Sequence, residues 1–187
     1  MSLSDSLARA ALTDRIQTVP GLLGDLRSDH AGETGAVMIY KGILVGSTDP
    51  EIRRFALDHL AAEQEHLKLI EAVLAPSARS RLLPMWKAAG WLTGFLPALM
   101  GPRAVYATIE AVEIFVDHHY AIQIAKLPET GATGLLRALL VMCQADEVLH
   151  RDEARAGLDG PAQGLLAAWT WLVGNGSAAA VMVARWI

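Results

Sequence analysis

Four glutamates and two histidines recur along this chain in a fixed order, and this pattern constrains the fold more than any other feature. An isolated glutamate precedes a Glu-x-x-His pair, and the same order then repeats: Glu33, Glu63 with His66, Glu113, and Glu147 with His150. Residues three apart lie on one face of a helix. Each pair would therefore point a carboxylate and an imidazole at the same neighbour, and we expect four helices around one core.

The rest of the chain also favours helices. No segment alternates with period two for long enough to build a sheet, whereas apolar residues recur three and four apart. Asp49 is a good N-cap and Pro50 suits a first helical turn. Glycines and prolines divide the chain into helices over residues 28–45, from 50 to before Pro76, 84–100, from 102 to before Pro128, 134–155, and after Pro161. The last is either continuous or broken at residues 174–176.

The two halves of the pattern echo each other. The gap from Glu33 to Glu63 is 30 residues and that from Glu113 to Glu147 is 34, about what an antiparallel helical hairpin needs. A tyrosine follows each isolated glutamate by seven residues, at Tyr40 and Tyr120. We therefore interpret the chain as two related hairpins that form a four-helix bundle.

Four carboxylates and two imidazoles in a bundle core are the ligand set of a di-iron or di-manganese centre. Burying four unpaired carboxylates costs several kcal/mol each, and two divalent cations would cancel their charge. The alternative is that each pair lies on a solvated helix face, in a metal-free structural bundle. Cys143 is expected to be a small buried residue. Four other histidines are expected to be structural or to support the ligands: His30, His59, His118 and His119.

Composition narrows the function classes. The 187 residues suffice for one domain, and the net charge of −4 without a basic run gives no footprint for a nucleic acid. A single cysteine excludes an intrachain disulfide. Residues 1–25 are expected to be an N-terminal extension without the apolar core of a signal peptide, and residues 26–187 to be the domain.

Two uncharged segments complicate the picture of a soluble protein. They cover residues 88–101 and 161–184, and all five tryptophans lie within or beside them: Trp86, Trp91, Trp169, Trp171 and Trp186. Tryptophan favours the boundary between lipid tails and headgroups. These segments therefore suggest docking on a membrane surface, with core packing or a true span as alternatives. Met100 and Met142 are expected in the core.

Several motifs carry a resemblance to a known family. They are DHAGETGA, EQEHL, PMWKAAGWLTG, VEIFVDHHYAIQI and DEVLHRDEA. From about Leu26 to the C-terminus, the chain resembles the demethoxyubiquinone hydroxylases of ubiquinone biosynthesis. The resemblance implies a ferritin-like di-iron monooxygenase with additional apolar helices that face the membrane. It would use O2 and an external electron donor to hydroxylate a polyprenyl methoxy-methyl-benzoquinol. We expect it on the cytoplasmic side of a bacterial inner membrane, as a possible homo-oligomer or with a lipid-presenting partner.

The resemblance also assigns residues. It makes Glu33, Glu63 and His66 ligands of one iron, and it makes Glu113, Glu147 and His150 ligands of the other, with Glu63 and Glu147 bridging. His119 and Tyr120 match a His-Tyr pair close to the quinone, and Asp29 and Asp146 would lie just outside the ligands.

The sequence departs from the family at Glu110, which lies one turn before Glu113. The distance to the HHY motif selects Glu113 as the ligand, and Glu110 is then a base near the site or a partner of Arg103.

Two other functions fit a metal-binding helical bundle. One is a di-iron hydroxylase acting on modified tRNA, and the acidic balance counts against it. The other is a ferritin-like iron store, which needs a soluble exterior that the tryptophan-rich tail contradicts.

Overall fold

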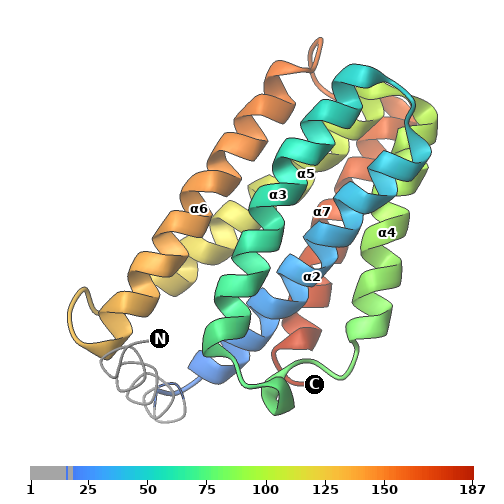
Figure 1. Cartoon of the computed structure of the whole chain (residues 1–187). Coiled ribbons are helices and arrows are strands. Elements are labelled where there is room, and N and C mark those ends of the chain that lie inside the picture. The colour runs from blue at the N-terminus through green and yellow to red at the C-terminus, as the bar shows by residue number, and fades with distance from the viewer. Residues whose placement is uncertain (1–15, 17–18) are drawn as a thin grey trace.

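The computed structural model describes Ile16 and residues 19–187, and all the regular structure in these residues is helical (Figure 1). The elements in chain order are α2 (Leu22–Gly46), α3 (Pro50–Val73), the short 3-10 helix η1 (Pro76–Ala78), α4 (Leu83–Met100), α5 (Pro102–Ile124), α6 (Ala132–Ala156) and α7 (Gly164–Ala184). This confirms the all-helical prediction. Most of the expected N-terminal extension lies outside the described residues.

Local chemistry explains where several helices begin and end. The Asp49 carboxylate accepts hydrogen bonds from the backbone N–H of Glu51 at 2.9 Å and of Ile52 at 3.1 Å, as expected for the cap of α3. The predicted start of α2 at Ser28 was wrong. The helix begins six residues earlier, after Gly21 in a left-handed conformation with φ of 80°, which a glycine adopts without strain.

Helix α7 runs without a break through the Gly-Asn-Gly segment at residues 174–176. The side-chain amide of Asn175 donates to the backbone carbonyl of Trp171 at 2.8 Å, one turn earlier. Glycine weakens a helix by only about 1 kcal/mol, whereas proline would interrupt it. The predicted alternative of a break in α7 was therefore wrong.

Four helices form the central bundle, and two more cover one side of it. Helices α2 and α3 pack together, as do α5 and α6, and α4 packs along α2 while α7 lies against α5 and α2. Figure 1 shows α6 on the opposite side of the bundle from α4. This is the ferritin-like arrangement expected from the sequence, with the two apolar segments as extra helices.

Helices α2 and α4 approach each other backbone to backbone through glycines. A Cβ atom on Gly94 of α4 would lie 1.9 Å from the carbonyl oxygen of Ile39, and one on Gly42 of α2 would lie 2.2 Å from that of Trp91. No side chain fits at either position. Small residues spaced four apart allow such close helix contacts, and the GxxxG repeats at residues 42–46 and 90–94 supply them.

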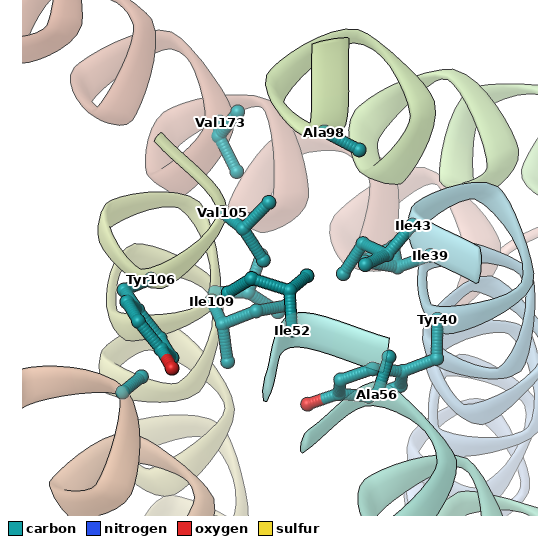
Figure 2. Close-up of a cluster of buried hydrophobic side chains, with 12 residues drawn as sticks. Ile39, Tyr40, Ile43, Ile52, Ala56, Ala98, Val105, Tyr106, Ile109 and Val173 are labelled. Carbon is teal, nitrogen blue, oxygen red and sulfur yellow. The ribbon is translucent and has the colours of Figure 1, made fainter. Parts of the chain in front are cut away.

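Two apolar clusters close the bundle at its ends and leave a polar middle. Figure 2 shows one cluster, in which Ile43 of α2, Ile52 of α3 and Ile109 of α5 are fully buried. The other cluster includes Leu26, Leu74 and Leu140. Because each bundle helix contributes to both clusters, its central turns are held in register around the polar middle.

The structure corrects two predicted core positions. Met100 is 64% exposed at the end of α4, and Met142 is 45% exposed on the outer face of α6. Cys143, the next residue of α6, points inward and is fully buried, as expected. Adjacent helical residues point about 100° apart, so only one of this pair can face the core.

Candidate metal centre and adjoining cavity

The structure brings all six residues of the repeated pattern together in the polar middle of the bundle. Their exposures range from 1% to 6%. Candidate ligand atoms that lie within 4.8 Å of one another form two groups: Glu33, Glu63, His66 and Glu147 in one, and Glu63, Glu113, Glu147 and His150 in the other. Glu63 and Glu147 belong to both groups. This buried cluster can hold metal ions.

Each histidine faces the glutamate of the other hairpin. The Nδ1 atom of His66 lies 3.1 Å from Oε1 of Glu147, and the Nδ1 atom of His150 lies 3.2 Å from Oε1 of Glu63. Each is also near the glutamate of its own pair, at 3.8 Å for His66 and 3.4 Å for His150. The two halves of the site therefore arrange their histidine and glutamates in nearly the same way.

The donor atoms of this cluster fit cations. Six of its buried atoms have no hydrogen-bond partner among the described residues: Oε2 of Glu33, both carboxylate oxygens of Glu63, Oε1 of Glu147, and Nδ1 of His66 and His150. Buried polar atoms are normally satisfied. Oxygen and imidazole donors without a thiolate suit iron or manganese. The convergence of these atoms is best explained by metal ions between them.

The pKa values of the buried groups show that their negative charges are unfavourable when no cation is present. Burial raises the pKa of Glu33 and Glu113 well above the ordinary value, and the charges on neighbouring carboxylates add to the shift. Burial disfavours the charged form of His150, but Glu147 and Glu63 outweigh it and raise the pKa to about 9. Protons on Glu33, Glu113 and His150 therefore reduce the cost of burying this site, and a metal ion would compete with them.

The tyrosines of the two halves exchange partners. The hydroxyl of Tyr40 on α2 donates to Glu113 on α5 at 3.2 Å, and the hydroxyl of Tyr120 on α5 donates to Glu33 on α2. The seven-residue spacing predicted an echo between the halves, but the exchange itself is visible only in the structure. Each hydroxyl fixes the glutamate of the opposite hairpin.

Polar side chains outside the six support them. Nε2 of His66 lies 2.9 Å from Oδ2 of Asp146. The His59 ring stacks on His150 with centroids 4.0 Å apart, and it bonds the Tyr40 hydroxyl at 3.1 Å. His59 also lies 2.7 Å from Glu153, an exposed residue that sequence reasoning missed because nothing in its spacing marks it.

The other histidines have different surroundings. Nε2 of His119 lies 2.9 Å from Oδ1 of Asp29, which also accepts a bond of 2.6 Å from Gln123. Nε2 of His30 lies 3.3 Å from Glu71 on α3. His118 is exposed.

The predicted partner of Glu110 was wrong. Its carboxylate accepts from Arg155 at 2.7 Å, whereas Arg103 donates to the backbone carbonyl of Pro161 at 3.0 Å. Glu110 lies one turn before Glu113 on the same helix but faces the last turn of α6. It lies outside both groups of candidate ligands.

A cavity of about 400 Å³ adjoins the four glutamates of the cluster. Carboxylates of the cluster line it together with His119 and Tyr120, the two residues predicted to act on substrate. Most of its wall is apolar and comes from α2, α4, α5 and α7, including Trp86 and Trp169. The cavity therefore extends from the candidate metal centre to the two helices that cover the bundle.

Comparison with known sequences identifies the family. The sequence model of the ubiquinone biosynthesis protein COQ7 matches residues 23–184. The chain belongs to the COQ7 family. The COQ7 match covers helices α2 to α7 except for Leu22, the first residue of α2.

Relatives within the COQ7 family share one named activity. The 3-demethoxyubiquinol 3-hydroxylase of Rhodospirillum rubrum is 36% identical over 76% of this chain and 64% of its own length. NADPH-dependent mitochondrial 3-demethoxyubiquinone 3-hydroxylases of Caenorhabditis elegans and Homo sapiens are 31% and 33% identical, over 86% and 85% of this chain. The chain spans 87% and 69% of those two relatives. The family predicted from the sequence motifs is confirmed.

Proposed function

We propose that this chain is a di-iron monooxygenase that hydroxylates the ring of demethoxyubiquinol in ubiquinone biosynthesis. The observation that carries the proposal is that the cluster of candidate metal ligands opens onto a largely apolar cavity. An iron store has no use for such a cavity, and the named activity of the relatives agrees with a quinol substrate rather than with tRNA.

The residues of the cluster would share two iron ions. Glu33, Glu63 and His66 would hold one ion and Glu113, Glu147 and His150 the other, with Glu63 and Glu147 available to both. Support comes from the two overlapping groups of ligand atoms. When bound, the iron pair supplies O2 activation. One oxygen atom enters a ring C–H bond of the substrate, and the other leaves as water after taking up two electrons and two protons.

The cavity would orient the quinol ring at the cluster. Its volume lies within the range of small-molecule sites, about 300 to 1,000 Å³. His119 presents a partly exposed ring to the cavity and is held from behind by Asp29, so it can bond an oxygen of the quinol. Tyr120 keeps Glu33 in place. The apolar walls would exclude water from the reacting ring.

The polyprenyl tail would leave the cavity between α4 and α7, toward a membrane. Both helices expose large apolar side chains, among them Leu96 and Leu99 on α4 and Leu165 and Trp171 on α7. Withdrawing the tail from lipid costs about 0.8 kcal/mol per methylene. An enzyme that docks on the bilayer avoids this cost, and we propose that this chain does so on the cytoplasmic face of an inner membrane.

Helix α7 is the described helix that is long and apolar enough to cross a membrane. Its two ends, however, are tied to the bundle. Trp169 donates to Thr108 at 2.8 Å, and Arg185 lies 2.5 Å from the buried Asp25. We therefore propose that α7 lies along the bundle with its outer face in the membrane surface.

The electrons would come from an external donor. Several relatives are named NADPH-dependent hydroxylases, and we propose a reduced nicotinamide as the source for this chain as well.

Mass spectrometry of quinones tests the function. Cells that lack the gene should accumulate demethoxyubiquinone, and the wild-type gene should clear it. A Glu63→Ala copy should fail, whereas Glu65→Ala, which changes an exposed residue on the same helix, should succeed. Normal ubiquinone in the deletion strain, or rescue by Glu63→Ala, would refute the proposal.

Flotation with phospholipid vesicles tests the docking face. Trp171 and Trp186 are 69% and 84% exposed, so their replacement by glutamate should abolish flotation without disturbing the core. Leu135→Glu changes a comparably exposed residue of α6 and serves as the control. Equal losses in the tryptophan variant and in the control would contradict a docking face at α7 and the residues that follow it.

A further inference from the structure

The two halves of the candidate metal centre differ in the side chain that contacts the Nε2 atom of the histidine. Nε2 of His66 lies 2.9 Å from Asp146, the residue just before Glu147. The equivalent position before Glu63 is Ala62, whose methyl group cannot bond to His150. No side chain in the described part of the molecule forms a hydrogen bond to Nε2 of His150.

The ligand atoms themselves are nearly equivalent in the two halves. Nδ1 of His66 is 3.1 Å from Glu147, and Nδ1 of His150 is 3.2 Å from Glu63. The position four residues before each paired glutamate also differs, because His59 stacks on His150 where the other half has Cys143. The asymmetry thus lies in the groups that support the histidines.

A carboxylate on the far nitrogen of a ligand histidine fixes the ring and increases its basicity toward the metal. Removing such a partner typically costs 10- to 100-fold in metal affinity. A stacked imidazole restrains the ring but bonds neither of its nitrogens. Because the Asp146 side chain is 42% exposed, water screens its charge and the low end of that range applies.

We infer that the two metal positions are unequal, and that the Glu33–His66 position binds its cation more tightly than the Glu113–His150 position. The inference rests on the proposed function in taking both positions as metal sites. It names Asp146 as a positioning residue for His66.

Single-site variants test this inference without repulsion between two cations. Glu113→Ala leaves the Glu33–His66 position, and Glu33→Ala leaves the Glu113–His150 position. Calorimetric titration with Co²⁺ alone, under anaerobic conditions, should give a dissociation constant about tenfold lower for Glu113→Ala than for Glu33→Ala. Equal constants, or the reverse order, would overturn the inference.

Two further changes identify the cause of the difference. Asp146→Asn should weaken Co²⁺ binding about tenfold in the Glu113→Ala background and leave the Glu33→Ala background unchanged. Asp152→Asn, on the exposed side of the same helix, should change neither. Ala62→Asp should tighten binding in the Glu33→Ala background by supplying the missing carboxylate. Equal weakening of both backgrounds by Asp146→Asn, or no effect of Ala62→Asp, would contradict the assigned role.

The titration separates this inference from the proposed function. Co²⁺ binding needs neither quinol nor reductant. A chain with two unequal Co²⁺ sites that hydroxylates nothing would refute the function alone, whereas an active hydroxylase with equal sites would refute the inference alone.

Discussion

The close contact between α2 and α4 predicts that a glycine-to-alanine change there lowers the free energy of unfolding, whereas the same change on α7 raises it. In Gly94→Ala, the new Cβ would lie 1.9 Å from the carbonyl oxygen of Ile39, whereas ordinary contact begins at 3.4 Å. Helix α4 would have to retreat by about 1.5 Å, because a backbone carbonyl cannot rotate away. In Gly174→Ala, the nearest atom is 3.7 Å away, so the methyl group fits.

The magnitudes follow from two opposing effects. Overpacking costs about 1 to 3 kcal/mol, and a backbone clash belongs at the upper end. Replacing a helical glycine by alanine recovers about 1 kcal/mol. We expect Gly94→Ala to lower the free energy of unfolding by about 2 kcal/mol and Gly174→Ala to raise it by about 1 kcal/mol.

Urea unfolding followed by circular dichroism at 222 nm measures both variants. The retreat of α4 would also widen the cavity, since Gly90 and Thr93 line it. Gly94→Ala should therefore raise KM for the quinol more than it lowers kcat. Unchanged stability of Gly94→Ala, or equal destabilisation by both variants, would refute backbone contact between the helices.

Three further predictions concern the centre and α7. Burial raises the pKa of Glu33 and Glu113 above the ordinary 4.5, so their protonated forms stabilise the metal-free fold below that pH and this contribution is lost as the pH rises. The melting temperature of the metal-free protein should fall from about pH 5 upward, and saturating Mn²⁺ should reverse the fall; a pH-independent melting temperature would contradict the assigned burial. Tyr120→Phe leaves a buried oxygen of Glu33 without its donor and should lower the free energy of unfolding in urea by about 1 to 3 kcal/mol. An unchanged free energy would show that this hydrogen bond does not form. Arg185→Ala removes the ion pair with Asp25 and should speed hydrogen exchange in the last turn of α7, while unchanged exchange would show that other contacts hold this end.

The sequence predicted that these six residues converge because the signal for it is local. A Glu-x-x-His pair fixes two side chains on one helix face, and the matched gaps in the two halves indicate how the helices pair. The cap at Asp49 and the buried Cys143 could be predicted on the same basis. The presence of iron and the assignment of individual ligands remain predictions.

The features that sequence reasoning missed depend on how helices pack. The family resemblance placed Asp146 just outside the ligands but did not indicate its contact with His66, and Glu153 was missed altogether. Both residues gain their roles from histidines on α3, about eighty or more residues away in the chain. Glu110 pairs with Arg155 rather than Arg103 because α5 turns that face toward the end of α6. The early start of α2 depends on a left-handed Gly21, which resembles many loop glycines in a sequence.

The distribution of the six candidate ligands has a consequence for synthesis in the cell. They span residues 33 to 150, and the histidine of the second pair is the last to leave the ribosome. Until His150 has emerged, a nascent chain lacks one imidazole and has carboxylates without a counter-charge. Under the proposed metal centre, both positions can therefore form only after most of the chain has been made, and a chain truncated before α6 would lack Glu147 and His150.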